Sequence, residues 1–218
     1  MLPKTTGTTG AAATAALSKH RIEALSDGVY AIAMTLLVLE LKIPEALHSD
    51  PSLQLAQALG QLIPKLVSWA LSFFILAIFW VAHHRLFHYV QTVDTKLLWI
   101  NVVSLLFVSM MPFSSALTGE FGGEFIAQVI YAANMTALAL VSIWQYRHLD
   151  QHRELTHNGF SLDVVNAGRF RCWSLVVTAL LAVAIAWFFP RIATMAFALM
   201  PLLSRVSRRF HTRPTAAT

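Results

Sequence analysis

The sequence predicts an all-α membrane protein with six transmembrane helices in each chain. Of its 218 residues, 56% are hydrophobic and 12% are charged, whereas soluble domains carry about 25% charged residues. Six apolar segments follow one another along the chain, and an α-helix needs about 20 apolar residues to cross a bilayer. No segment between them is long enough to form a soluble domain.

The first apolar segment contains an acid. From Gly28 to Leu39 the sequence has no charged residue, but a helix of this length reaches only about 18 Å, whereas the apolar part of a bilayer is about 30 Å thick. A spanning helix must therefore run from about Ile22 to Leu41, which places Asp27 below the membrane surface. Because an ionisable residue there is costly, it is by default a functional hypothesis.

Five further segments complete the predicted bundle. They are Leu62–Phe87, Leu97–Leu117, Phe125–Tyr146, Phe170–Phe189 and Ile192–Leu203. The last one is short, and Pro190 separates it from its predecessor, so we expect a tilted or partial span. We assign residues 19–204 to this membrane domain. Residues 1–18 are rich in Thr, Ala and Gly and are predicted to form a disordered cytoplasmic tail, and residues 205–218 a basic cytoplasmic tail.

The charges of the loops predict the orientation. Cytoplasmic loops of membrane proteins are enriched in Lys and Arg. Of the 16 Lys and Arg residues, all but Lys42, Lys65 and Arg191 fall on the side that holds both termini. Both termini are therefore predicted to be cytoplasmic. We attribute the net charge of +5 to this asymmetry and not to nucleic-acid binding.

One face of the first helix carries a single hydroxyl among apolar residues. Positions three and four apart share a face of a helix, and Ile32, Thr35 and Leu39 form such a stripe, which Gly28 extends by one turn. Two interpretations are open at this point. The stripe could pack against a neighbouring helix, with the Thr35 hydroxyl bonded to a carbonyl one turn earlier, or it could line a pore.

A polar group lies near the cytoplasmic start of the same helix. It consists of Arg21, Ser26 and Asp27, and a charge below the membrane surface needs a partner. The cytoplasmic ends of the second and third helices lie at the same depth and offer five candidates: Trp80, His83, His84, Arg85 and Asn101. We expect a structural hydrogen-bonded cluster there, and a proton relay through a histidine is the alternative.

The sequence contains no pattern typical of an enzyme or a metal site. The adjacent His83 and His84 point about 100° apart on a helix, so one metal site would not use both. His148 and His152 are four residues apart, but we assign them to a solvated loop. No nucleophile, base and oxyanion donors converge. We therefore predict no catalytic residue, no metal, no cofactor and no small-molecule substrate.

Three motifs stand in the first half of the chain. The first is Arg21-Ile-Glu-Ala-Leu25-Ser26-Asp27. The second is Trp80-Val-Ala-His83, continuing into Arg85-Leu86-Phe87. The third runs from Asp94 through Asn101 to Met111-Pro112-Phe113. In their order over residues 21–118 these motifs resemble a family of potassium channels, which comprises the lysosomal leak channel called transmembrane protein 175 and its prokaryotic relatives. The first motif is similar to the signature R-x-x-x-F-S-D of that family, with Leu25 in place of Phe.

The resemblance implies a pore surrounded by the first helix of each of four subunits, in a homotetramer with no re-entrant filter loop. It implies a hydrophobic constriction at Ile32, a selectivity-determining hydroxyl at Thr35 and a further apolar ring at Leu39. It also implies a hydrogen-bond and ion-pair knot that holds the pore helix in place. The residues of this knot are Arg21, Ser26, Asp27, His83 and Asn101.

The function that the resemblance implies is passive, potassium-selective conduction of the leak type across a bacterial plasma membrane. Potassium is then the permeating ion, and membrane lipid surrounds the tetramer. The alternative is a proton-conducting or proton-coupled transporter that uses Asp27 and His83. No charged residue lies on the upper part of the stripe, where coupled carriers usually place one, and this favours the channel.

Overall fold

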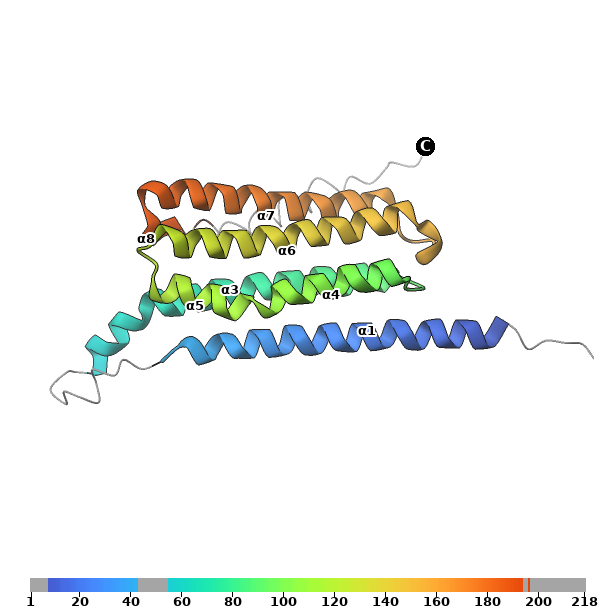
Figure 1. Ribbon diagram of the computed structural model, residues 1–218, viewed down its shortest axis with the longest axis horizontal. Helices are drawn as coiled ribbons and strands as arrows, with labels where there is room; N and C mark the ends of the chain where they lie inside the picture. Colours follow the sequence, from blue (N-terminus) through green and yellow to red (C-terminus); the bar gives the residue numbers. More distant parts are fainter. Residues whose placement is uncertain (1–7, 43–54, 194–195, 197–218) are drawn as a thin grey trace, which may run out of the picture.

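The protein is a bundle of long helices (Figure 1). The computed structural model describes residues 8–42, 55–193 and 196. In chain order the elements are α1 (Thr8–Leu36), the 3-10 turn η1 (Leu37–Glu40), α3 (Leu55–Tyr89), α4 (Thr95–Ser109), α5 (Met111–Glu120), α6 (Phe125–Gln151), the 3-10 turn η2 (Arg153–Leu155), α7 (Leu162–Phe188) and α8 (Pro190–Ala193). The predicted all-α fold is confirmed for this part of the chain.

Five stretches are long and apolar enough to cross a membrane. They are Lys19–Glu40, Leu62–Tyr89, Thr95–Glu120, Phe125–Gln151 and Leu162–Phe188, and they correspond to the first five predicted segments. The fifth starts earlier than the predicted Phe170, because the Ser161 hydroxyl caps α7 by accepting a hydrogen bond from Val164 N (3.4 Å). The sixth predicted segment lies almost wholly outside the described residues, so the count of six stays a prediction.

Helix α1 extends further towards the N-terminus than the sequence analysis predicted. Residues 1–18 were expected to be a disordered tail, but the structure is helical from Thr8 onwards. The stretch 10–17 consists mostly of alanine, which has the highest helix propensity, and lengthening an existing helix avoids the cost of nucleation. For residues 8–18 the structure therefore differs from the prediction. Residues 1–7 and 205–218 lie outside the described part of the chain.

The third span consists of two helices. Helix α4 ends at Ser109 and α5 begins at Met111, with Met110 between them (φ −78°, ψ −9°). Inside an unbroken helix Pro112 would remove a hydrogen bond, and its ring would clash with a carbonyl one turn earlier. In the structure Pro112 stands in the first turn of α5, where its missing N–H costs nothing.

Helix α1 lies along one edge of the bundle (Figure 1), where it contacts α3, α4 and α5. Helix α6 packs against α4 and α5, and α7 covers α6 on the far side. Large apolar side chains such as Tyr30, Leu76, Met111 and Leu138 are fully buried between these helices. Polar side chains such as Asn101 are buried with them, whereas many outward side chains of α7 are large and apolar. This distribution is typical of a protein whose solvent is lipid.

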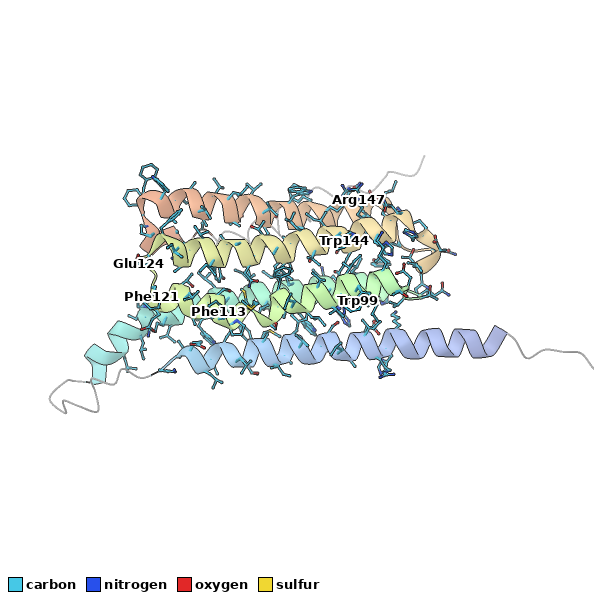
Figure 2. All side chains as sticks on the ribbon, in the orientation of Figure 1. Trp99, Phe113, Phe121, Glu124, Trp144 and Arg147 are labelled. Atoms are coloured by element: carbon cyan, nitrogen blue, oxygen red, sulfur yellow. The ribbon has the colours of Figure 1, made fainter. Side chains whose placement is uncertain are left out.

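The two ends of the bundle differ in charge. At one end α4 and α7 begin and α3 and α6 end; it carries Arg21, Arg85, Lys96, Arg147 and Arg171, and we call it the basic end. Figure 2 shows Trp99, Trp144 and Arg147 towards this end, and Phe121 and Glu124 at the opposite end. Tryptophan is enriched where a membrane meets water, so these positions agree with helices that cross it.

The helix ends at the basic end are tied together through Asp94. Its carboxylate caps α4 by accepting a hydrogen bond from Leu97 N (2.8 Å), and it also contacts Nε2 of His148 on α6 (2.9 Å). Burial raises the pKa of the Asp94 carboxyl, but the contacts with Leu97 N and His148 outweigh this effect and hold the pKa below its usual range. His148, which we expected in a solvated loop, is therefore a buried residue of α6, because it has a carboxylate partner there.

Gly168 allows α7 to approach α6. A Cβ atom at this position would lie 2.2 Å from the ring of the buried Tyr146. We therefore expect Gly168→Ala to displace Tyr146 and to lower the free energy of unfolding by about 1–3 kcal/mol. The measurement is the midpoint of thermal unfolding in detergent.

The matched control is Gly60→Ala in α3, because a Cβ atom there meets no atom within 4 Å. Alanine also favours the helix over glycine, so this control should unfold at the same temperature as the wild type or above it. An equal midpoint for wild type and Gly168→Ala would contradict the tight α6–α7 contact.

Candidate functional site

Helix α1 and the 3-10 turn η1 that continues it have one face against the bundle and one face that is exposed in the single chain. The buried face carries Ile22, Ser26, Tyr30, Ala33 and Leu37 at intervals of three or four residues. The exposed face carries the stripe found in the sequence: Ile32 and Leu39 are 59% and 63% exposed, and Gly28 and Thr35 are exposed between them. Among the described residues no other helix covers the stripe, so packing within this part of the chain does not account for it.

The buried face is held by a chain of hydrogen bonds across three helices. The Ser26 hydroxyl donates to the carbonyl of Ile22 (2.9 Å) and accepts a hydrogen bond from Nδ2 of Asn101 on α4 (3.0 Å). Oδ1 of Asn101 accepts in turn from Nε2 of Gln145 on α6 (3.4 Å). All three polar side chains are buried. Hydrogen bonds between polar side chains are one of the few forces that join helices in lipid.

Asp27 has a partner on α3. Nε1 of Trp80 donates a hydrogen bond to Oδ1 of Asp27 (2.8 Å). Trp80 is one of the five candidates that the sequence offered. The Asp27 side chain is exposed in the single chain, on the side of α1 next to the stripe. This hydrogen bond joins α1 to α3, and the hydrogen bond of the neighbouring Ser26 joins α1 to α4.

Two residues of the expected knot take no part in these hydrogen bonds. Arg21 is exposed and has no ion pair among the described residues; at the end of a spanning helix its long side chain can reach water. His83 is buried between aromatic rings, with centroids 4.3 Å from Phe87 and 6.0 Å from Tyr30. Within the described structure its Nε2 has no hydrogen-bond partner. The hydrogen-bonded cluster therefore consists of Ser26, Asp27 and Asn101 with Trp80 and Gln145.

Sequence reasoning missed Gln145. Its signal was an amide in the last third of a membrane-spanning helix, near the same end of the bundle as Asn101. A second polar layer near the opposite end was missed as well. There Ser68 bonds Thr118 (2.7 Å), Ser72 bonds Ser115 (2.8 Å), and Asn134 donates to Ser114 (3.2 Å). The spacings of these hydroxyls along α3 and α5 could have indicated it.

The environment of the Thr35 hydroxyl is compatible with both interpretations that the sequence left open. It donates its hydrogen to the carbonyl of Ile32 (2.9 Å), as expected of a threonine within a helix. A hydroxyl that donates in this way keeps its oxygen lone pairs free. Because Thr35 lies on the exposed face, these lone pairs are available to a cation outside the chain.

The five spans define an integral membrane protein, and the similarity to known proteins places it in the class of ion channels. A family model described as endosomal/lysosomal potassium channel TMEM175 matches residues 21–112. A protein of Streptomyces collinus described as a potassium channel is 36% identical over 155 residues, which are 69% of this chain and 74% of that protein. The chain belongs to the TMEM175 family, as the motifs around Arg21, Trp80 and Asn101 predicted.

Two further comparisons extend this result. The crystal structure of a lysosomal potassium-selective channel TMEM175 homolog from Chamaesiphon minutus has a TM-score of 0.72 and 29% identity, and the match covers 87% of this chain and 98% of that one. The Gallus gallus protein described as endosomal/lysosomal proton channel TMEM175 is 36% identical over 114 residues, which are 48% of this chain and 22% of that protein. Gln145 lies outside the residues that the family model matches.

The Ser26–Asn101 contact can be tested with a double-mutant cycle. We expect Ser26→Ala and Asn101→Leu each to lower the free energy of unfolding, and the pair to show a coupling of about 0.5–2 kcal/mol. The measurement is unfolding of the purified protein by denaturing detergent.

The control cycle pairs Asn101→Leu with Ser109→Ala, because the Ser109 hydroxyl is exposed and bonds only to the carbonyl of Leu106 in its own helix. That cycle should show no coupling. Additive effects of Ser26→Ala and Asn101→Leu would contradict the hydrogen bond between them.

Proposed function

We propose that the protein is a potassium-selective channel of the leak type, and that the first helices of four subunits line its pore. The observation that carries the proposal is the exposed stripe Gly28, Ile32, Thr35 and Leu39 on an edge helix of a membrane bundle. The potassium channels among its relatives support the choice of ion. Channel conduction involves no covalent chemistry, so we propose neither an enzyme activity nor a cofactor.

A pore on this stripe requires several copies of α1, because a single helix presents only one row of side chains. Gly28 leaves room for a close neighbour, since a Cβ atom there meets nothing within 4 Å in the single chain. Ala31 is also small and exposed. Small residues of this kind let helix backbones approach each other in membranes, and closed rotational symmetry is the rule for homo-oligomers. A homotetramer with α1 at its centre satisfies these conditions.

In this tetramer Ile32 forms the constriction. Four isoleucine side chains around an axis exclude water from a narrow pore, and a dewetted pore blocks ions without any charge. Leu39 forms a second apolar ring about 10 Å further along the axis. Opening then requires a movement of α1 that lets water return to the ring of Ile32.

Thr35 supplies the selectivity. Four hydroxyl oxygens, each with its hydrogen held by the carbonyl of Ile32, face a permeating ion with lone pairs only. They replace part of the hydration shell of K⁺. Because this is one ring of neutral oxygens instead of a stack of carbonyl rings, the discrimination between K⁺ and Na⁺ is modest.

The hydrogen-bonded cluster positions the pore helix. Ser26 and Asp27 are held by Asn101 and Trp80, one to two turns from Ile32, so the orientation of the stripe depends on them. We propose that Arg21 anchors the start of α1 at the membrane surface, and that His83 supports Tyr30 on the buried face through ring contact.

The proposed setting is a bacterial plasma membrane with the basic end towards the cytoplasm. Lys and Arg are retained on the cytoplasmic side of membrane proteins, and the basic end carries Arg85, Arg147 and Arg171. Both termini then lie in the cytoplasm, residues 19–204 form the channel domain, and the apolar outer faces of α3 and α7 contact lipid.

Proton conduction is the second candidate. The chicken relative is described as a proton channel, and a small cavity beside His83 is also lined by Ser104, Gln145 and Tyr146. Its volume accessible to the centre of a water molecule is about 30 Å³, which is enough for about two waters. However, the partner of Asp27 is an indole N–H, which donates only and cannot pass a proton on. A relay from Asp27 to His83 is therefore less well supported than the potassium pore.

Removal of the apolar ring should open the pore. We expect Ile32→Ser to raise K⁺ flux into liposomes several-fold, because a polar ring stays hydrated. Val177→Ser is the control, since Val177 is exposed on α7, away from the proposed axis. Proton flux is recorded in parallel: unchanged K⁺ flux in Ile32→Ser would contradict the constriction, and proton flux without K⁺ flux would favour the second candidate.

Removal of the hydroxyl ring should reduce selectivity. We expect Thr35→Ala to lower the K⁺/Na⁺ permeability ratio several-fold, while conduction persists, because the ring of acceptor oxygens is lost. Thr35→Ser keeps the hydroxyl and should keep the ratio. The measurement is the reversal potential under mixed K⁺ and Na⁺ gradients, and an equal ratio in wild type and Thr35→Ala would remove Thr35 from the pathway.

A further inference from the structure

Two adjoining cavities open between α3 and α7 near the basic end. They have about 300 Å³ and 260 Å³ of space for the centres of water molecules, and Arg85 and Arg171 line both. Helices α3 and α7 make few close contacts with each other in the described bundle. The two cavities therefore form one groove, which we call the α3–α7 groove, with two arginines at the junction of its halves.

The half of the groove at the basic end is cationic. Besides Arg85 and Arg171 it is lined by His84, His88 and Tyr146, and its described lining contains no carboxylate. The guanidinium groups of Arg171 and Arg85 both lie close enough to the Tyr146 hydroxyl to interact with it electrostatically. Nε of Arg171 is buried and has no hydrogen-bond partner in the described structure. A buried N–H without a partner is costly, so an anion or another acceptor in this half of the groove would stabilise it.

The other half of the groove is apolar and leads towards the middle of the membrane. Its lining includes Phe74, Ile78 and Val81 of α3, which share one face of the helix with Arg85 because they are spaced by three or four residues. This face is about 16 Å long. A positive site at the membrane surface, followed by an apolar stretch of the groove along the same face, matches a molecule with an anionic head and a long apolar tail.

We propose that the α3–α7 groove binds an anionic phospholipid, with its phosphate between Arg85 and Arg171 and one acyl chain along Phe74, Ile78 and Val81. Basic pockets between transmembrane helices favour anionic head groups in this way. The basic tail 205–218 is a poor match in charge for the cationic half, because it carries Arg205, Arg208, Arg209 and Arg213 and would bring positive charge to a positive site. The proposal does not depend on potassium conduction.

The test is lipid binding to the full chain, measured by native mass spectrometry in detergent with added phosphatidylglycerol or phosphatidylcholine. We expect the wild type to retain phosphatidylglycerol in preference, and the double variant Arg85→Gln/Arg171→Gln to lose about tenfold or more of this binding. Arg85→Gln alone, at an exposed position, should show a partial loss and guards against misfolding of the double variant.

The matched control is Arg147→Gln, which removes the same charge at the same end of the bundle but outside the groove (Figure 2). It should bind phosphatidylglycerol like the wild type. Equal loss in Arg147→Gln, equal binding of both lipids, or unchanged binding in both groove variants would overturn the proposal. Displacement of the lipid by millimolar inorganic phosphate alone would do so too, because the groove would then hold a free anion. No flux is measured, so a negative result leaves the proposed channel function unaffected.

Discussion

The hydrogen bond from the Asn101 amide to the Ser26 hydroxyl is the contact on which the position of α1 depends. In lipid the apolar residues of a helix gain little by moving from acyl chains to another helix, so polar contacts and close packing decide where an edge helix lies. Asn101 is itself held by Gln145, and this links α1 through α4 to α6. The Trp80–Asp27 hydrogen bond links α1 to α3 as well. With two partners on adjacent residues, both the depth and the rotation of α1 about its axis are set.

This constraint determines what the exposed stripe can do. Towards the opposite end Leu37 of η1 is fully buried, and η1 contacts α3 and α5, so α1 is held near both ends of its membrane span. Ile32 and Thr35 lie between these two supports. In the proposed pore, a rotation that moves Ile32 off the axis has to be taken up between Ser26 and Leu37, by twisting of the helix or by movement of α3 and α4 with it. The proposed gate would then be stiff, because it opens only when α1 twists or when the helices that hold it move.

The sequence predicted those features that depend on local periodicity, and it failed where the outcome depends on the direction of a long side chain. The five apolar spans, the stripe of Ile32, Thr35 and Leu39 and the depth of Ser26 and Asn101 all follow from hydropathy and helical spacing. Arg21 and His83 lie at the right depth too, but one side chain is exposed and the other is enclosed by Tyr30 and Phe87. The burial of His148 depends on the loop that brings Asp94 to α6, which spacing along the chain does not show.

Two groups of charges at the basic end differ in their surroundings. Lys19 pairs with Glu23, Asp94 with His148 and Arg153 with Asp150, and these pairs lie at the ends of the membrane spans or in the loops next to them. Arg85 and Arg171 have no carboxylate partner among the described residues, and they lie on the two helices that leave a groove between them. A paired charge needs no external counter-ion, because its partner belongs to the same chain. The ligand proposed for the two arginines above the apolar groove is an anion with an apolar tail, and the membrane itself contains such molecules.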